Sequence, residues 1–341
     1  MPERLENILI IKPSSLGDIV LALPALAALG KSFPRARISW LVRPEFAPLL
    51  QGHPYLDEII HFDRRYLGRA WRDPAAMKAL VSLILKLRKR RFDTVLDLQG
   101  LFRTASLAWL SGCRRRFGMS NAREMAHLFY THKISPNSKT VHVVDYYLKI
   151  ARAAGASCRE VVFLLPDTGI DPGGVIERSG LIPGRYVVLV PTSAHRNKCW
   201  PVERFAELAE RIVSDSSLSV AAVGSAAERP LVERLCRKAK VTVTNLAGLT
   251  DLEQLVAVLR AAAAVVSNDT GPGHIAAALG GPVVLIFGRS NPARVAPYGR
   301  MNCVAAVEPE NRGTCHSSLA PRHDVAAVTV DDVYERLRRQ L

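Results

Sequence analysis

Short apolar runs alternate with longer amphipathic runs through the first half of the chain. Ile8–Ile11, Arg37–Val42 and Thr94–Leu98 are short and apolar, whereas the stretch that ends at Leu29 and the stretch at about 75–90 have the length and periodicity of helices. Strands that alternate with helices are typical of a parallel sheet with helices on both faces. The first half is therefore predicted to be a doubly wound, Rossmann-like domain.

The second half shows the same alternation after an interruption. Prolines and glycines gather at about 165–184, and Tyr186–Val190 then restarts the pattern. The later elements that the pattern predicts are helices at 202–213, 230–238 and 252–262 and strands at 218–223, 264–267 and 283–287. We expect two Rossmann-like domains, an N-terminal one at 1–170 and a C-terminal one at 180–341.

Composition indicates a globular cytoplasmic protein. Apolar residues make up 48% of the 341 residues, which is enough for two ordinary cores. The six cysteines form no C-x-x-C pair and are expected to be reduced thiols. The first residues, Met1–Asn7, lack signal-peptide character, and the apolar stretch Ile19–Leu29 is too short to cross a bilayer. We therefore expect neither secretion nor a transmembrane segment.

Positive charge is concentrated in the first half. The formal net charge is +15, and basic residues cluster at Lys86–Arg91 and Arg114–Arg116. Such runs suit nucleic acid, an anionic membrane surface or a phosphorylated substrate, and a solvated surface is the alternative for either run. No helix-turn-helix, zinc-finger or aromatic–basic RNA motif accompanies them, so nucleic acid is not expected as a partner.

A glycine-rich corner in the second half has the character of a phosphate site. The apolar run Val265–Ser267 ends in the polar stretch Asn268–His274, and Ile275–Leu279 then continues as a helix. Free N–H groups and the positive end of the helix dipole favour an anion at such a corner. Asp269 and His274 add polar groups able to hold a sugar. A simple helix cap is the alternative interpretation.

Two other predicted strand ends carry polar groups that complete a nucleotide site. Thr192 and Ser193 follow one strand with Lys198 shortly after, and Glu228 follows the next strand. Hydroxyls and an ammonium would bind a pyrophosphate, and a carboxylate beyond the neighbouring strand would hold ribose hydroxyls. Taken singly, Lys198 and Glu228 also fit solvated loop charges. The chain has no P-loop and no G-x-G-x-x-G, which disfavours a kinase or a dinucleotide-dependent dehydrogenase.

A second polar corner lies near the start of the chain. Lys12–Asp18 separates the first predicted strand from the first predicted helix, and Asp18 would stand at the start of that helix. A carboxylate in this position is either a general base or a charge that stabilises the helix dipole.

Four motifs together make the chain resemble glycosyltransferase family 9, the bacterial lipopolysaccharide heptosyltransferases. They are Lys12-x-Ser14-Ser15-x-Gly17-Asp18, Asp97-x-Gln99-Gly100, Lys198-x-Trp200-Pro201 and Asp269-Thr270-Gly271-x-x-His274. The resemblance implies the α/β GT-B fold, with two doubly wound Rossmann-like domains facing across a cleft. It also implies ADP-heptose as donor and a cytoplasmic location at the inner membrane.

Within the family the chain is most similar to the members that add the first heptose to Kdo-lipid A. The stretches that suggest this are Arg64-Arg65, Asp97–Leu101, Ala122–Glu124 and Leu128–Tyr130. One departure is Thr192-Ser193-Ala194, where those members have two consecutive threonines ahead of the lysine. Which hydroxyls meet the phosphates therefore stays open.

The resemblance implies an inverting transfer without a cofactor. Asp18 would take the proton of the attacking acceptor hydroxyl, and Lys198 would stabilise the leaving ADP. The chain contains no Asp-x-Asp motif, so no metal is expected at the diphosphate. The expected donor-binding residues are Thr192, Ser193, Lys198, Glu228, Leu249, Asp269, Thr270, Gly271 and His274. The expected acceptor-binding residues are Ser14, Ser15, Gly17, Arg64, Arg65, Gln99 and Arg123.

The expected partners are an ADP-sugar, an anionic glycolipid of the Kdo-lipid A type and, peripherally, the inner membrane. We expect the basic runs Arg88–Arg91 and Arg114–Arg116 to supply the membrane contact. Two alternatives remain: a family 9 enzyme that transfers a second heptose or another sugar, and a non-enzymatic binder of anionic lipid or nucleic acid. The second alternative does not explain why polar residues follow three of the predicted strands in the second half.

Overall fold

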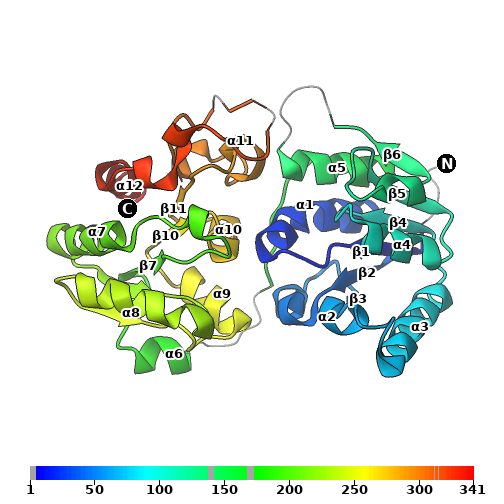
Figure 1. Ribbon diagram of the computed structural model, residues 1–341, viewed down its shortest axis with the longest axis horizontal. Coiled ribbons are helices and arrows are strands. Elements are labelled where there is room, and N and C mark those ends of the chain that lie inside the picture. The colour runs from blue at the N-terminus through cyan, green and yellow to red at the C-terminus, as the bar shows by residue number, and fades with distance from the viewer. Residues whose placement is uncertain (1–4, 137–141, 167–172, 311, 314) are drawn as a thin grey trace. The chain divides into compact units, whose positions relative to one another are not determined.

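The chain divides into two compact units, Met1–Pro166 and Asp167–Leu341 (Figure 1). The computed structural model describes residues 5–136, 142–166, 173–310, 312–313 and 315–341. Residues 167–172 of the predicted linker and the first four residues of the chain lie outside the described residues.

Unit 1 is built on a six-stranded parallel sheet of order β3-β2-β1-β4-β5-β6. Its strands are β1 (Asn7–Ile11), β2 (Arg37–Val42), β3 (Glu58–His61), β4 (Thr94–Asp97), β5 (Arg115–Met119) and β6 (His132–Ile134). Its α-helices are α1 (Leu16–Ser32), α2 (Arg64–Leu67), α3 (Pro74–Lys89), α4 (Phe102–Leu110) and α5 (Val143–Ala153). The 3₁₀ segments η1 (Pro44–Leu50) and η2 (Ala126–Phe129) lie between them.

Unit 2 repeats this plan with the order β12-β11-β10-β7-β8-β9. Its strands are β7 (Tyr186–Val190), β8 (Ser219–Ala222), β9 (Val243–Asn245), β10 (Ala264–Asn268), β11 (Val283–Ile286) and β12 (Val304–Ala305). Its α-helices are α6 (Gly173–Arg178), α7 (Val202–Asp215), α8 (Arg229–Lys238), α9 (Leu252–Arg260), α10 (Gly271–Ala278), α11 (Pro292–Val295) and α12 (Val330–Arg338). Short 3₁₀ segments, η3 (Arg196–Lys198) to η7 (Val325–Ala327), lie in its connections.

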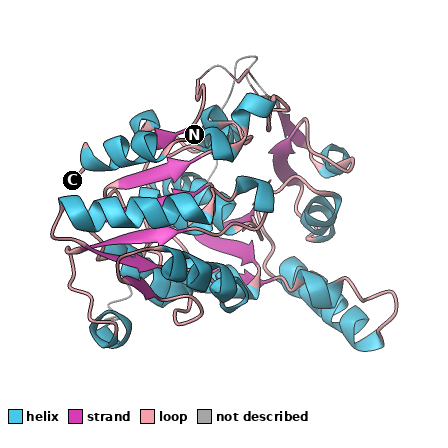
Figure 2. Ribbon diagram, turned by 60° about the vertical axis from the view of Figure 1, so that its left-hand side comes forward, coloured by secondary structure: helices cyan, strands magenta, loops and turns pink. Residues whose placement is uncertain are grey.

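The central strands are apolar because helices cover both faces of each sheet (Figure 2). All of β7 and β10 is buried, as is β1 from Ile8 onward. On one face of unit 1, Leu83 and Leu87 of α3 pack against Leu9 and other strand residues. The apolar runs that predicted these strands are therefore the cores of the two units.

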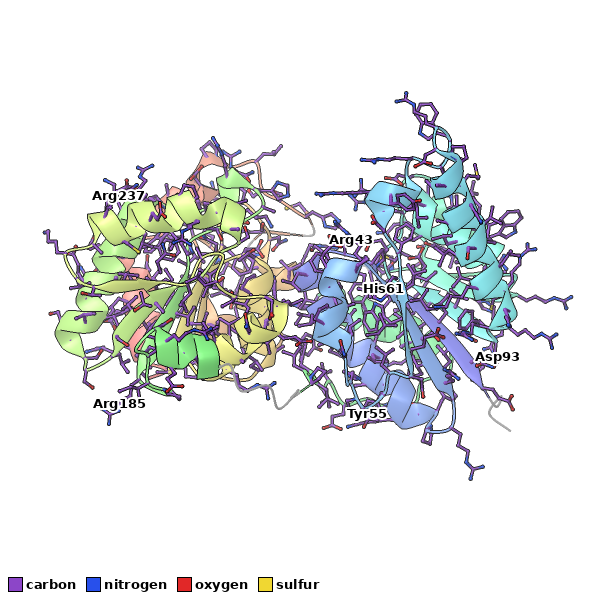
Figure 3. All side chains as sticks on the ribbon, turned by 90° about the horizontal axis from the view of Figure 1, so that it is seen from below. Arg43, Tyr55, His61, Asp93, Arg185 and Arg237 are labelled. Atoms are coloured by element: carbon purple, nitrogen blue, oxygen red, sulfur yellow. The ribbon has the colours of Figure 1, made fainter. Side chains whose placement is uncertain are left out.

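Both sheets have a point at which the strand order reverses. In unit 1 the chain moves from β1 to β2 and β3 on one side and then to β4 on the other, and in unit 2 β7 and β10 flank the equivalent point. Open parallel sheets bind ligands at this point, beyond the carboxyl ends of the strands. In unit 1, Arg43 and His61 mark that end, whereas Asp93, which precedes β4, marks the amino end (Figure 3). The predicted doubly wound architecture is confirmed.

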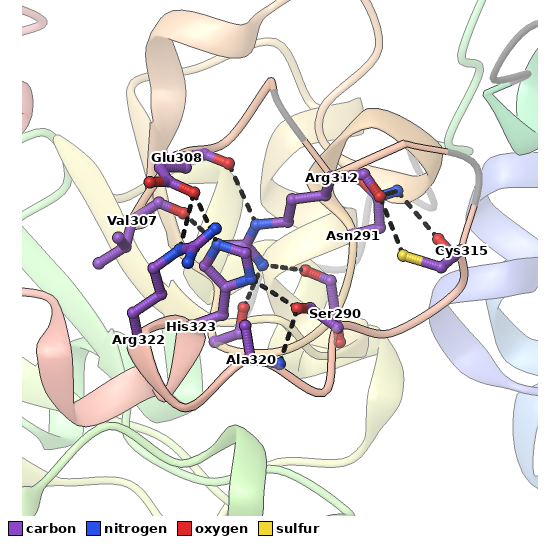
Figure 4. A network of polar contacts seen from close by, with 11 residues as sticks. Ser290, Asn291, Val307, Glu308, Arg312, Cys315, Ala320, Arg322 and His323 are labelled. Atoms are coloured by element: carbon purple, nitrogen blue, oxygen red, sulfur yellow. Dashed lines mark hydrogen bonds and ion pairs between the residues drawn. The ribbon is translucent and has the colours of Figure 1, made fainter.

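A polar network joins the segment that follows β11 to the segment that follows β12 (Figure 4). The buried Arg312 guanidinium donates to the carbonyls of Ser290 at 2.7 Å and of Glu308 at 3.2 Å, and it also bonds those of Gly288 and Val307. The Asn291 amide donates to the Cys315 carbonyl at 2.9 Å. Side-chain hydrogen bonds to backbone carbonyls thus hold these two segments together. None of the helices in the described residues is long and apolar enough to cross a membrane.

Candidate donor and acceptor sites

The candidate donor residues gather at the reversal point of unit 2. Val190 of β7 is paired with Ser267 of β10, so the segments that follow these two strands begin side by side. Thr192 and Ser193 lie in the first segment, and Asp269 and Thr270 lie in the second. The strand order therefore brings together hydroxyls and a carboxylate that are more than 70 positions apart in the sequence.

A buried tryptophan holds the segment that carries Lys198. The indole N–H of Trp200 donates to the Val328 carbonyl at 2.9 Å, and its ring packs edge-on against Phe205. The Trp200 backbone N–H donates to the Asn268 side chain at 2.9 Å, which ties this segment to the end of β10. With Trp200 fixed in this way, the segment places the Lys198 ammonium so that it donates to Asp269 Oδ2 at 2.6 Å.

Asp269 is a buried carboxylate held in its charged form by two partners. His274 Nε2 lies 3.3 Å from Asp269 Oδ1, and Lys198 contacts the other oxygen. Burial acts to raise the pKa of Asp269, but His274 and Lys198 outweigh it and hold the pKa well below its ordinary value. Asp269 therefore positions the Lys198 ammonium at the start of α10.

Asp269→Asn should destabilise the protein at neutral pH and progressively less in acid. The carboxylate has a lower pKa in the folded state than the value of about 4 in the unfolded chain. Its stabilisation is therefore complete above that pH and is lost as the pH falls toward the folded-state pKa. Urea unfolding of both proteins at pH 7 and pH 3 measures the difference. A difference in unfolding free energy that does not shrink at pH 3 would contradict this assignment.

The first turn of α10 contains two glycines, Gly271 and Gly273. Thr270 is the N-cap, and Pro272 has no N–H, so the orphan donors of the first turn are those of Gly271 and Gly273. A Cβ on Gly273 would lie 2.3 Å from Leu285 Cδ2 and 2.6 Å from Ser267 Oγ. Glycine at this position therefore lets the helix pack tightly on β10 and β11. Exposed N–H groups at a helix start bind phosphate.

Glu228 and Leu249 lie beyond the two neighbouring strands, β8 and β9. Glu228 Oε2 accepts hydrogen bonds from the Ser225 N–H at 2.7 Å and the Ser225 hydroxyl at 2.8 Å. The Gly248 N–H donates to the Gly224 carbonyl at 2.9 Å, which joins the two turns. Leu249 follows with half of its surface exposed. One carboxylate and one exposed apolar side chain thus stand at the same edge of the unit 2 sheet.

In unit 1 the reversal point holds a buried cation beside the candidate base. The Lys12 ammonium lies 3.9 Å from Asp18 Oδ2 and 5.4 Å from the centre of the Tyr147 ring. Burial acts to lower the pKa of Lys12, but Asp18, Tyr147 and Asp97 raise it above its ordinary value. A fixed positive charge therefore faces Asp18. From the sequence, Lys12 is recognised only as part of a motif, because the local pattern shows neither its burial nor its contact with Tyr147.

The Asp18 carboxylate lies at the start of α1 and is partly exposed. Its Oδ2 accepts hydrogen bonds from the Ser15 N–H at 3.1 Å and the Ser15 hydroxyl at 2.8 Å, as in a capping box. Its side chain is 38% exposed, so the carboxylate remains within reach of a ligand. The geometry is compatible with both interpretations drawn from the sequence.

A second buried carboxylate, Asp97, shapes the turn that carries Gln99. Asp97 Oδ2 accepts from the Tyr130 hydroxyl at 2.7 Å, and Oδ1 accepts from the Gln99 N–H at 2.9 Å. Burial raises the pKa of Asp97, and these hydrogen bonds oppose the rise. Gly118 permits the contact, since a Cβ there would lie 2.3 Å from the Tyr130 ring. Among the described residues, Gln99 Oε1 is a buried acceptor with no hydrogen-bond partner.

The candidate acceptor arginines lie at the same edge of unit 1. The Arg123 N–H donates to the Gly100 carbonyl at 3.1 Å, which places its loop beside the Gln99 turn. Arg64 begins α2 directly after β3 and lines a groove of about 580 Å³ together with Arg103 and Glu124. The side chains of Arg64, Arg65 and Arg123 are exposed.

Part of the basic run Arg114–Arg116 is hydrogen-bonded to the protein's own backbone. Arg115 and Arg116 begin β5, and the Arg116 guanidinium donates to the carbonyls of Phe129, at 2.7 Å, and Cys113. Two donors of Arg116 are therefore bound to the protein's own backbone, and the expected membrane contact of this run stays a prediction. In the described residues no group of three or more His, Cys, Asp or Glu side chains is placed to hold a metal ion.

The family model for glycosyltransferase family 9 (heptosyltransferase) matches residues 80–322. The chain belongs to this family. It is 29% identical to the lipopolysaccharide core heptosyltransferase OpsX of Haemophilus influenzae, over 91% of this chain and 86% of that protein. It is 31% identical to lipopolysaccharide heptosyltransferase 1 of Pseudomonas aeruginosa, over 86% of this chain and 82% of that protein.

A solved family 9 structure, E. coli heptosyltransferase WaaC with ADP-2-deoxy-2-fluoro heptose, superposes with a TM-score of 0.74. The identity is 25%, and the alignment covers 98% of this chain and 100% of that chain. The GT-B fold is confirmed, and the protein is a glycosyltransferase. Heptosyltransferases 2 and 3 of E. coli also match, so the comparisons do not separate the types within the family.

Proposed function

We propose that this enzyme transfers heptose from ADP-L-glycero-D-manno-heptose to the Kdo region of lipid A during synthesis of the lipopolysaccharide inner core. The observation that carries the proposal is the cluster of Lys198, Asp269 and the start of α10 at the reversal point of unit 2. A family 9 relative has been solved with an ADP-heptose analogue. A charge-paired lysine beside free helix N–H groups is what a nucleoside diphosphate requires.

In the proposed donor complex, Lys198, the hydroxyls of Thr192 and Ser193 and the N–H groups that follow Thr270 bind the diphosphate. The Glu228 carboxylate, which also accepts a hydrogen bond from the Ser225 N–H, binds ribose hydroxyls. The exposed Leu249 provides an apolar surface for the adenine. Asp269 and His274 keep the lysine and the helix start in place. The same groups stabilise the negative charge that develops on the departing ADP.

In the proposed acceptor complex, Arg64, Arg65 and Arg123 bind the carboxylate and phosphate groups of Kdo-lipid A. Guanidinium forks suit such groups because they bind two oxygens at once. Ser14, Ser15, Gly17 and Gln99 line the same edge of unit 1, and the unpartnered Gln99 oxygen would accept a hydrogen bond from a sugar hydroxyl.

The proposed reaction is a direct displacement. Asp18 takes the proton of the acceptor hydroxyl, the acceptor oxygen forms a bond to the anomeric carbon, and the bond from that carbon to the diphosphate breaks. ADP leaves with the electron pair, and the anomeric configuration inverts. Lys12, whose ammonium lies 3.9 Å from Asp18 Oδ2, orients the carboxylate before the proton moves. No metal or cofactor takes part in this scheme, and the enzyme works in the cytoplasm at the inner membrane.

ADP release with three acceptor conditions tests the proposal. The purified enzyme receives ADP-heptose with Kdo-lipid A, with Kdo-lipid A that already carries one heptose, or with no acceptor. We expect rapid ADP release only with the first. Release only with the heptosylated acceptor would instead establish the second-heptose alternative, and release with neither would contradict the proposal.

A further inference from the structure

Helix α3 has two apolar faces, and only one of them packs on the sheet. Ala76, Leu83 and Leu87 are buried against unit 1. Met77, Val81 and Leu85 recur at every fourth position and are 45%, 45% and 60% exposed. Side chains four apart lie on one side of a helix, so these three form a stripe about 12 Å long. We name these three residues the α3 stripe.

More exposed apolar surface lies near the α3 stripe. Trp71, just before the helix, is 70% exposed, and Phe102 and Trp109 on the neighbouring helix α4 are more than half exposed. The groove between α2, α3 and α4 has apolar walls that include Leu80 and Leu110. Helices α3 and α4 are neighbours on one side of unit 1 (Figure 1). Exposed apolar side chains that recur along one side of a helix, as in the α3 stripe, mark an interaction surface.

The same segment is strongly cationic. Residues 64–91 contain ten lysines and arginines and one aspartate. Lys86 and Arg90 pair with Glu58, but within the described part of the chain Lys78 and Lys89 of α3 have no carboxylate at ion-pair distance. The Arg72 guanidinium stacks on the Trp71 ring, 3.6 Å from its centre. The exposed apolar side chains therefore stand among positive charges.

This combination fits the surface of an anionic lipid bilayer. Helices that lie in the membrane interface bury aliphatic and tryptophan side chains while lysine and arginine side chains reach the anionic headgroups. A second copy of the chain would bring ten cations against ten cations. Nucleic acid would leave Val81 and Leu85 without an apolar contact.

We propose that the α3 stripe and Trp71 insert into the interface of anionic membranes and dock the enzyme there. This inference rests on the proposed function, because it is the lipid-linked acceptor that gives the enzyme a reason to reach a bilayer. Of the two basic runs expected at the membrane, it favours Arg88–Arg91, which begins on α3, and adds an apolar contact that the sequence did not indicate.

Vesicle binding of charge-matched variants tests the docking surface. Val81→Glu and Leu85→Glu each add one negative charge to the α3 stripe. Ala75→Glu adds the same charge to an exposed position on another side of the same helix. With vesicles rich in phosphatidylglycerol, we expect the stripe variants to bind about tenfold or more weakly than wild type, since each loses a buried apolar side chain. Ala75→Glu should stay within about fivefold, as expected from about 1 kcal/mol for a single surface charge.

Thermal unfolding first confirms that each variant is folded, and the double variant Val81→Ser/Leu85→Ser repeats the test without a charge change. In a second arm, brominated lipids should quench the fluorescence of wild type more than that of Trp71→Phe. Equal binding by the stripe variants and Ala75→Glu would overturn the proposal. So would absence of wild-type binding, or a wild-type dimer that Leu85→Glu converts to a monomer.

Activity on a water-soluble acceptor that lacks acyl chains separates this inference from the proposed function. Leu85→Glu should retain wild-type turnover on the soluble acceptor and lose it on the acceptor embedded in vesicles. If wild type transfers heptose to neither acceptor, the proposed function fails, whatever the vesicle binding. If Leu85→Glu is as active as wild type on embedded acceptor, the docking role of the stripe fails.

Discussion

Asp18→Asn is expected to lower turnover by about 10²- to 10⁴-fold, the usual effect of removing a general base. Asparagine keeps the size of the side chain and can still contact Ser15, but it cannot take the acceptor proton. Affinity for ADP should stay within a few-fold, because the donor residues belong to unit 2. Steady-state rates with saturating ADP-heptose and acceptor, together with calorimetric titration of ADP, measure both quantities.

Asp145→Asn is the matched control. Asp145 holds the third position of α5, as Asp18 does in α1, so both substitutions remove a carboxylate from the first turn of a helix in unit 1. If Asp18 is only a charge that stabilises its helix, the two variants should have similar turnover and similar losses of thermal stability. Near-normal turnover of Asp18→Asn would therefore remove Asp18 from the mechanism.

Lys198→Ala is expected to lower kcat/KM for ADP-heptose by about 10²- to 10³-fold, as found when a donor to developing negative charge is removed. The Lys198 ammonium lies at the start of α10, where Asp269 holds it at 2.6 Å. Affinity for ADP should fall as well, since the same charge contacts the ground-state diphosphate. Initial rates at varied donor concentration and ADP titration test this expectation.

Arg196→Ala serves as its control, because Arg196 is exposed in the same 3₁₀ turn and carries the same charge. We expect its kinetics to be close to wild type. The melting temperature of Lys198→Ala must also be followed, since the variant removes one of the two side chains that contact the buried Asp269 carboxylate. A large loss of stability with normal kcat/KM in the folded fraction would make the Lys198–Asp269 pair structural.

The sequence allowed the fold to be predicted because buried parallel strands are unbroken apolar runs. Tyr186–Val190 and Ala264–Asn268 are fully buried, so their composition alone marked them as strands. The polar stretch after each strand then indicated where a ligand would bind, since parallel strands place those stretches at one edge. The short strands at the sheet edges, such as His132–Ile134, carry too few apolar residues to stand out.

The features of the candidate sites that the sequence did not reveal depend on contacts between distant segments of the chain. The Asp97–Tyr130 hydrogen bond joins positions 33 apart, and the contact of Trp200 with the Val328 carbonyl joins positions 128 apart. Burial of Lys12 follows from the strand order around β1, which local periodicity does not give. The apolar residues of α3 extend over most of its circumference, so the pattern predicted a helix without showing that Leu85 faces solvent.

Analysis of the reaction product tests the central claim most directly. The enzyme is incubated with ADP-heptose and Kdo-lipid A, and the glycolipid is examined by mass spectrometry and by NMR of the new linkage. The account predicts one added heptose, attached to Kdo, with an anomeric configuration opposite to that of the donor. Retention of the donor configuration, attachment to a sugar other than Kdo, or an unchanged acceptor in the presence of active, folded enzyme would contradict it.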